Sequence, residues 1–205
     1  HFMLKEIHDG PRAVRDTLSS VLSSDIEAFF AENEFETINI VACGTAMHAG
    51  LIGKFMTEKL ARIPVNVYIA SEFRYQDPIL GSRDLVILIS QSGETADTVA
   101  ALRLAKARGA RTLAVVNVIG STVAREADRI LLTLAGPEIS VASTKAYSSQ
   151  ITVMYVLSVK LAALKGKLTA GEAEALLEEL ASKVPAAIEE VIGQKEKIRL
   201  LAGEF

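Results

Sequence analysis

The sequence is poor in the residues that build cross-links, metal sites and basic surfaces. Its 205 residues include one cysteine, which excludes an internal disulfide framework and fits a reducing, cytoplasmic compartment. The three histidines, His1, His8 and His48, are scattered without metal-ligand spacing, so we expect neither a metal ion nor a cofactor. The net charge is -3 and no basic patch forms, which argues against a nucleic-acid partner.

Long apolar runs are also missing. No stretch is long enough to cross a membrane and no signal peptide is visible, so we expect no membrane partner. With 50% hydrophobic and 23% charged residues, the chain fits one α/β domain with a large core, or at most such a domain with an appended helical piece. Because it opens with His-Phe-Met rather than a start methionine, we expect it to be a piece of a longer polypeptide.

The most informative stretch is 84–97, Asp-Leu-Val-Ile-Leu-Ile-Ser-Gln-Ser-Gly-Glu-Thr-Ala-Asp. Its apolar run, 85–89, is typical of a strand that is covered on both faces in a parallel sheet. A short polar turn follows, and then apolar residues recur at helical spacing from Ala96 until Gly109 closes the helix. The stretch therefore predicts a strand, a turn rich in hydroxyl groups and a helix.

This turn could hold an anion such as a phosphate. The first N–H groups of a helix lack partners within the helix and the dipole end is positive, while Ser90, Ser92 and Thr95 add hydroxyl donors. Gly93 lets the backbone approach a ligand closely. The competing interpretation is that Ser92 or Thr95 does no more than cap the helix.

The rest of the chain repeats the same alternation. We expect a doubly wound, parallel five-stranded sheet flanked by helices, a flavodoxin-like three-layer α/β sandwich. Residues 1–10 are expected to be an extended lead-in from an upstream domain, Pro11 the first turn of a helix, and Pro185 a break in the C-terminal helix. The expected strands are 37–43, 65–69, 84–89, 111–117 and 129–134, and the other main helices are 11–30, 47–62, 121–127 and 146–164.

Three of the expected helices start with glycine, serine or threonine. These starts are Gly44-Thr45, 90–95 and Ser143-Thr144, the last of which we expect to cap its helix. In an open α/β sheet, ligands bind beyond the carboxyl ends of the strands, where the strand order reverses. All three starts can reach one crevice there. No P-loop and no Gly-x-Gly-x-x-Gly pattern is present, so a compact monophosphate fits better than a nucleotide.

Four motifs together resemble the sugar isomerase (SIS) domain. They are Cys43-Gly-Thr45, Ser71-Glu-Phe-Arg-Tyr75, the 90–97 turn and Val141-Ala-Ser-Thr-Lys145. Over nearly the whole chain, the sequence is most similar to the first of two SIS domains in the isomerase half of the glutamine–fructose-6-phosphate aminotransferase family, the glucosamine-6-phosphate synthases. The resemblance implies a linker from a glutaminase domain (1–10), a SIS domain (11–166) and a helical extension toward a second SIS domain (167–205).

The resemblance also implies the roles of individual residues. The positions that hold the phosphate of fructose 6-phosphate or glucosamine 6-phosphate are Ser90, Gln91, Ser92 and Thr95. The positions that line or cover the sugar are Cys43, Gly44, Thr45, Val141 and Ser143. One departure is Ala46, where family members often have serine, so one hydroxyl contact is missing.

The family's catalytic residues are expected to lie outside this segment. The resemblance places the acid–base glutamate, the Schiff-base lysine and the ring-opening histidine in the second SIS domain, and a catalytic cysteine in the glutaminase domain. It also implies a homodimer, with the glutaminase and second SIS domains of the same chain as partners. We therefore expect this segment to bind sugar phosphate without isomerising it.

Several alternatives stay open. We expect Glu94 to interact with a helix dipole rather than to act as a base, and leave the role of Glu138 undecided. Cys43, without a histidine nearby, is expected to pack beside the sugar rather than to act as a nucleophile, and Lys145 could contact a ligand or form an ion pair. The alternative functions are a stand-alone phosphosugar isomerase and a sugar-phosphate-sensing module.

Overall fold

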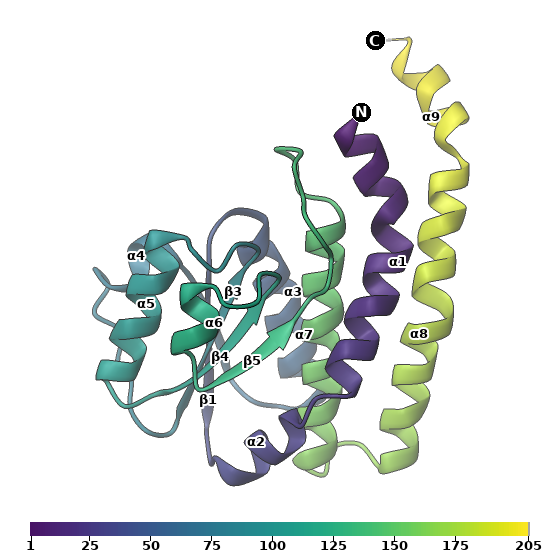
Figure 1. Ribbon diagram of the computed structural model, residues 1–205. Helices are drawn as coiled ribbons and strands as arrows, with labels where there is room; N and C mark the ends of the chain where they lie inside the picture. Colours follow the sequence, from purple (N-terminus) through teal and green to yellow (C-terminus); the bar gives the residue numbers. More distant parts are fainter. Residues whose placement is uncertain (205) are drawn as a thin grey trace.

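A five-stranded parallel sheet forms the centre of the protein (Figure 1). The structure is a computed structural model, and it describes residues 1–204. The strand order is β2-β1-β3-β4-β5, and every neighbouring pair is parallel. This confirms the predicted doubly wound sheet. The strands are β1 (Thr37–Ala42), β2 (Val65–Ile69), β3 (Asp84–Ser90), β4 (Arg111–Val116) and β5 (Arg129–Leu132).

Side chains alternate between the two faces of the sheet, and each face has its own core. In β3, Leu85, Ile87 and Ile89 face one core, and Val86 and Leu88 face the other. The first core is covered by α1 (Phe2–Leu22), α2 (Ile26–Glu32), α3 (Gly44–Leu60) and α7 (Lys145–Leu164). The second is covered by α4 (Ala70–Phe73), α5 (Ala96–Ala107) and α6 (Thr122–Glu126).

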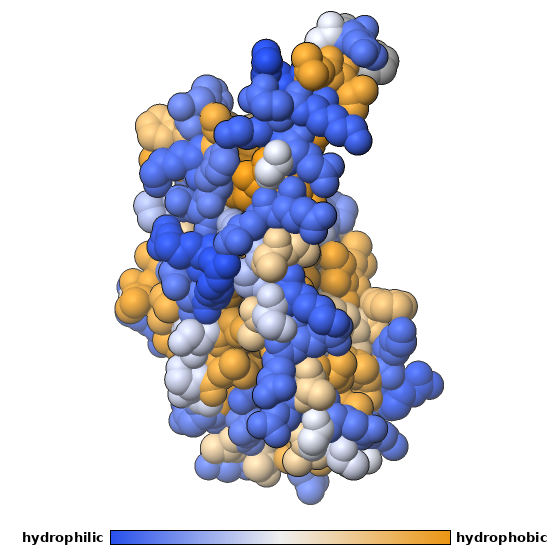
Figure 2. Space-filling view, turned by 90° about the vertical axis from the view of Figure 1, so that its right-hand side faces the viewer, coloured by the Kyte–Doolittle hydropathy of each residue, from blue (hydrophilic) through white to orange (hydrophobic). Residues whose placement is uncertain are grey.

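Two further helices lie outside this sandwich. Helix α8 (Ala170–Gly193) runs alongside α1, and α9 (Lys195–Ala202) continues beyond it (Figure 1). A capping box between Thr169 and Glu172 starts α8. Figure 2 shows the side of the molecule on which these helices lie as a mosaic of charged and apolar residues, with apolar side chains near its upper end. Within residues 1–204, no helix combines the length and the apolar character that a membrane crossing needs.

The expectation for the N-terminus was wrong. Residues 2–10 are not extended but form the first half of α1, which continues through Pro11. The reason is tertiary: Glu6 and Asp9 contact the segment 139–145, more than 130 positions along the chain. Local sequence preferences do not include these distant contacts, and they favour a proline such as Pro11 in the first turn of a helix.

The predicted break at Pro185 is also absent. Helix α8 passes through this buried proline without interruption, although an interior proline costs about 3 kcal/mol in an isolated helix. Packing of α8 against α1 and α7 offsets this cost. Leu180 reaches the core, and Ile188 lies against Gly10 of α1. The predicted helix 11–30 is also not continuous, because the chain leaves α1 at Leu22 and starts α2 at Ile26. In the remaining helices the boundaries differ from the prediction by a few residues, with α3 beginning at Gly44 instead of 47.

Candidate functional site

A pocket of about 240 Å³, which we call the sheet-end pocket, lies at the carboxyl ends of β1 and β3. These strands are neighbours, and the chain leaves them toward opposite edges of the sheet, so the pocket is at the point where strand order reverses. From β1, β3 and the adjoining turns it is lined by Cys43, Ile89, Ser90, Gln91 and Ser92. From helices and the loop before α7 it is lined by Thr45, Ala46, Thr95, Thr98, Glu138, Ser143 and Gln150.

The structure brings together all but two of the predicted site residues. The exceptions are Gly44 and Val141. Gly44 is the first residue of α3, where a φ of 56° requires glycine and only its backbone can serve the pocket. The Val141 side chain is fully exposed at the tip of the loop before α7. Cys43 is half-buried beside the pocket with a free thiol, and His48 points to solvent.

The turn between β3 and α5 presents hydroxyl groups that can donate. The Ser90 hydroxyl oxygen accepts a hydrogen bond from the Gly93 N–H at 3.0 Å, and that of Ser92 accepts from the Glu94 N–H at 3.2 Å. Both hydroxyl hydrogens remain available to a ligand. Thr95 is the N-cap residue of α5, but its side chain makes no capping bond to the described residues. Capping of α5 therefore does not account for these hydroxyls.

Gly93 gives this turn its tight shape. Its φ of 65° lies in the left-handed region, and a Cβ there would lie 2.1 Å from the Ser121 hydroxyl oxygen. The Gly93 carbonyl also accepts from the N–H of Val123 in α6, at 3.0 Å. Both the backbone conformation and the contact with Ser121 exclude a side chain at this position.

Glu94 interacts with a helix N-terminus, as expected, but the helix is α6 rather than its own. Its carboxylate accepts from the backbone N–H of Thr122 at 2.6 Å and from the Thr122 hydroxyl at 2.8 Å. These bonds, the backbone one foremost, hold the pKa of Glu94 below its ordinary value. A carboxylate held in this way is a poor proton acceptor, so a catalytic-base role is not supported.

The N-terminus of α7 is capped by Glu138, and the predicted side-chain cap by Ser143 or Thr144 was wrong. The Glu138 carboxylate accepts from the backbone N–H groups of Thr144, at 2.9 Å, and Ala146, at 3.3 Å. The Ser143 hydroxyl donates to the same carboxylate at 3.0 Å. A glutamate reaches farther than serine or threonine and satisfies two helix donors at once. Glu138 therefore orders the loop and leaves little capacity for a base.

The loop before α7 is held from behind by α1. The buried Glu6 carboxylate accepts from the Ile139 N–H at 2.6 Å and from the hydroxyl and N–H of Ser140. These bonds, the Ser140 hydroxyl first among them, lower the pKa of Glu6. One turn along, Asp9 pairs at 3.3 Å with the ammonium of Lys145, which is only 2% exposed. Of the two roles considered for Lys145, the structure shows the ion pair.

The electrostatic character of the pocket comes from dipoles rather than from cations. Among the described residues that line it, none is lysine or arginine. The N-termini of α3, α5 and α7 all border it; those of α3 and α5 present a partial positive charge, whereas that of α7 is compensated by the Glu138 carboxylate. The site can therefore hold an anion by backbone and hydroxyl donors. Within residues 1–204, no cluster of three or more metal-ligating side chains occurs.

Two polar residues of the pocket were not predicted. Thr98 lies one turn after Thr95 on α5, and the i,i+3 spacing of two threonines could have suggested it. Gln150 lies in the second turn of α7, within the predicted helix 146–164. Its only signal in the sequence was a polar residue on a helix that also carries several serine and threonine residues.

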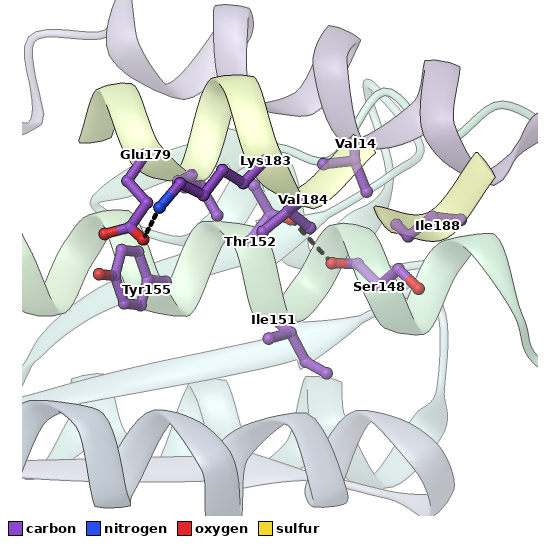
Figure 3. Close-up of a pocket in the computed structure, with 10 residues that line it drawn as sticks. Val14, Ser148, Ile151, Thr152, Tyr155, Glu179, Lys183, Val184 and Ile188 are labelled. Carbon is purple, nitrogen blue, oxygen red and sulfur yellow. Dashed lines mark hydrogen bonds and ion pairs between the residues drawn. The ribbon is translucent and has the colours of Figure 1, made fainter. Parts of the chain in front are cut away.

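A second hollow of about 440 Å³, the helical groove, lies between α1, α7 and α8 (Figure 3). Apolar side chains such as Val14, Ile151 and Val184 dominate its lining. Its two charged side chains, Glu179 and Lys183, pair with each other at 2.6 Å along α8. Although larger than the sheet-end pocket, the groove offers few free polar groups.

The SIS domain model matches residues 33–160 of this chain. The glutamine–fructose-6-phosphate aminotransferases [isomerizing] of Clostridium tetani and Clostridium acetobutylicum are 54% and 53% identical to it, over 100% and 98% of the chain. The chain spans only 35% and 34% of those relatives, about a third of their length.

Solved structures show the same similarity. The C-terminal domain of glucosamine-fructose-6-phosphate aminotransferase from Francisella tularensis is 37% identical with a TM-score of 0.91, covering 98% of this chain and 58% of that one. Glucosamine-6-phosphate deaminase from Thermotoga maritima is 25% identical with a TM-score of 0.67, covering 86% of this chain and 52% of that one.

Proposed function

The chain belongs to the SIS domain family, and on that premise we propose that it is the sugar-phosphate-binding domain of a glutamine–fructose-6-phosphate aminotransferase. Such an enzyme converts fructose 6-phosphate and glutamine to glucosamine 6-phosphate and glutamate. In this proposal the sheet-end pocket holds fructose 6-phosphate or glucosamine 6-phosphate.

The observation that carries the proposal is the convergence of hydroxyl donors with the N-termini of α3 and α5, neither of which has a side-chain cap among the described residues, on one pocket. Hydroxyls with a free hydrogen and unpaired backbone N–H groups suit a phosphate, which offers only acceptors at neutral pH. We assign the phosphate to Ser90, Gln91, Ser92 and Thr95. We assign the sugar to Cys43, Gly44, Thr45, Val141 and Ser143.

The length of the relatives supports a proposal about the rest of the enzyme. Because the chain spans about a third of their length, we propose that it works with a glutaminase domain and a second SIS domain of the same polypeptide, as a homodimer in the cytoplasm. Residues 1–10 then belong to the linker from the glutaminase domain, 11–166 to the SIS domain and 167–205 to an extension toward the second one.

The isolated chain should bind the substrate without transforming it. The two carboxylates nearest the pocket, Glu94 and Glu138, each accept hydrogen bonds from a helix N-terminus, so neither is placed to move a proton. Incubation with fructose 6-phosphate and ammonia should yield no glucosamine 6-phosphate above the no-protein blank. Robust product from this chain alone would instead support a stand-alone phosphosugar isomerase.

Titration calorimetry tests the binding directly. Fructose 6-phosphate and glucosamine 6-phosphate should each release heat with one-to-one stoichiometry, and inorganic phosphate should bind more weakly because it lacks the sugar contacts. Fructose without phosphate is the matched control and should give no heat. Equal affinity for fructose and fructose 6-phosphate would contradict the assignment of the turn at 90–95 to a phosphate.

A further inference from the structure

The side chain of Gln150 lines the sheet-end pocket, and its oxygen has no hydrogen-bond partner among the described residues. It projects from the second turn of α7 and is only 3% exposed. Its carboxamide oxygen is buried and accepts no hydrogen bond from the described residues. A buried carbonyl without a partner is rare, because burial removes the hydrogen bonds that water would have made.

Three neighbouring polar side chains of the pocket, in contrast, are held by hydrogen bonds. The Glu138 carboxylate accepts from two backbone N–H groups, and the Ser90 hydroxyl accepts from Gly93. The Gln91 carboxamide, whose oxygen also lacks a partner among residues 1–204, lies with its amide nitrogen 3.4 Å from the Gly136 carbonyl. Of the two carboxamides that line the pocket, only that of Gln150 is fixed at neither end by a hydrogen bond within the described part of the chain.

We propose that the carboxamide oxygen of Gln150 accepts a hydrogen bond from a hydroxyl group of the bound sugar. The proposal rests on the function proposed above and adds a ligand contact to it. A carboxamide oxygen can only accept, so it does not suit a phosphate, whose oxygens also accept. The sugar hydroxyls are the donors that such a ligand brings.

Selectivity follows from this assignment. The turn at 90–95 recognises the anionic end of the ligand and does not distinguish one phosphate ester from another. A ligand that brings a donor compensates this buried acceptor, whereas a ligand without a donor gains nothing from it. Gln150 would therefore favour a polyhydroxylated phosphate ester over a phosphate with an apolar body.

The chain offers a matched control one position away. Ser149 is fully buried on α7, and its hydroxyl also lacks a partner among the described residues, but it does not line the pocket. Removing either oxygen relieves an unsatisfied buried group in the free protein. Only the removal at Gln150 should affect binding.

The test compares Gln150→Leu with Ser149→Ala by calorimetry and thermal unfolding of the 205-residue chain. Gln150→Leu should weaken fructose 6-phosphate binding about tenfold. It should leave inorganic phosphate binding unchanged, and raise the midpoint of thermal unfolding without ligand by about 2–4 °C. Ser149→Ala should also raise the midpoint but leave both affinities unchanged. Gln150→Met, which keeps the length of the side chain, repeats the test should the leucine variant not fold.

The outcomes separate this inference from the proposed function. If the unmodified chain binds no sugar phosphate, the proposed function fails. If it binds and both Gln150 variants bind equally well, only the contact from Gln150 is excluded. A Gln150 variant that weakens the binding of inorganic phosphate as much as that of fructose 6-phosphate would also overturn the proposed contact. The loss of affinity would then lie in the phosphate site.

Discussion

The sheet-end pocket and the helical groove differ in what their polar groups do. In the groove, Glu179 and Lys183 pair with each other, and the Thr152 hydroxyl donates to the Ser148 carbonyl of its own helix. In the pocket, the hydroxyls of Ser90 and Ser92 keep free hydrogens and the Gln150 oxygen has no partner in the described part of the chain. The groove has about 440 Å³ and the pocket about 240 Å³, so the smaller hollow has the larger unused capacity for hydrogen bonds.

The difference shows that volume alone does not identify a ligand site. An apolar hollow between helices arises wherever ridges of side chains fail to interlock, and it needs no ligand to be stable. A buried group without a partner costs free energy in the empty protein, and where it borders a pocket a ligand can compensate that cost. Four variants test the pocket, the loop before α7 and the groove in turn.

The largest effect is expected from the double substitution Ser92→Ala with Thr95→Ala. Each hydroxyl bond to a charged group is worth about 1.5–3 kcal/mol, so losing two should weaken fructose 6-phosphate binding by at least about 100-fold. Titration calorimetry measures this. The control is Thr152→Ala in the groove, which should leave the affinity unchanged; an unaltered affinity in the double variant would place the phosphate elsewhere.

Gly93→Ala should cost about 3 kcal/mol of unfolding free energy and also weaken binding. The added Cβ would meet Ser121 at 2.1 Å, and the positive φ adds strain. Gly109→Ala is the control: it has a φ of 81° but open space around it, so only the backbone cost of about 1 kcal/mol should appear in urea unfolding. An equal loss of unfolding free energy in the two variants would show that Ser121 can move away from the added Cβ at no cost.

Glu6→Gln should loosen the loop before α7 without unfolding the sheet. The amides of Ile139 and Ser140 should exchange hydrogen faster, because one carboxylate that accepts from both is lost. In the unmodified protein the pKa of Glu6 is lowered from 4.5, so its stabilisation is complete above about pH 4.5 and is lost as the pH falls through the lowered value.

Hydrogen exchange, corrected for intrinsic rates, should therefore show constant protection of these amides from pH 7 to about pH 5 and a decline below about 4.5. Glu36→Gln, a surface carboxylate paired with Arg83, is the control and should change nothing at this loop. Protection that declines equally in the Glu6 variant would assign the pH dependence to another group.

Lys183→Ala should have the smallest effect. Its pair with Glu179 is exposed and lies at i,i+4, so the loss should be no more than about 0.5 kcal/mol and should shrink further in salt. Thermal unfolding measures the stability, and fructose 6-phosphate titration should be unaltered. A clear loss of binding here would remove the distinction between groove and pocket.

Much of the fold was predictable because its signals are local. The apolar run of β3, the glycine after α5 and the alternation of strands and helices led directly to the parallel sheet, and the polar turns after β1 and β3 indicated the pocket. Adjacent strands of a parallel sheet end at the same edge, so residues distant in sequence could be placed together without knowledge of contacts.

The errors concern residues whose partners are far along the chain. The helical state of residues 2–10 depends on bonds from Glu6 and Asp9 to 139–145, and the passage of α8 through Pro185 depends on packing against α1 and α7. Glu138 replaced the predicted caps because its carboxylate reaches over five residues of loop. The sequence analysis did not predict Gln150, because helical periodicity indicates which face of a helix is buried but not whether that face borders a cavity.

Two contacts of α1, one made by Glu6 and the other by Thr17, fix the length of helix between them. Glu6 bonds the loop at Ile139 and Ser140, and the Thr17 hydroxyl bonds the Thr133 carbonyl at the end of the sheet. Eleven positions separate the two residues, about three full turns, so both point toward the same stretch of chain. Deleting one residue between them would change the helical phase by about 100°, and either the loop or the strand end would lose its hold. Between Glu6 and Thr17 we therefore expect relatives to differ by substitutions, with insertions and deletions confined to the ends of the helix.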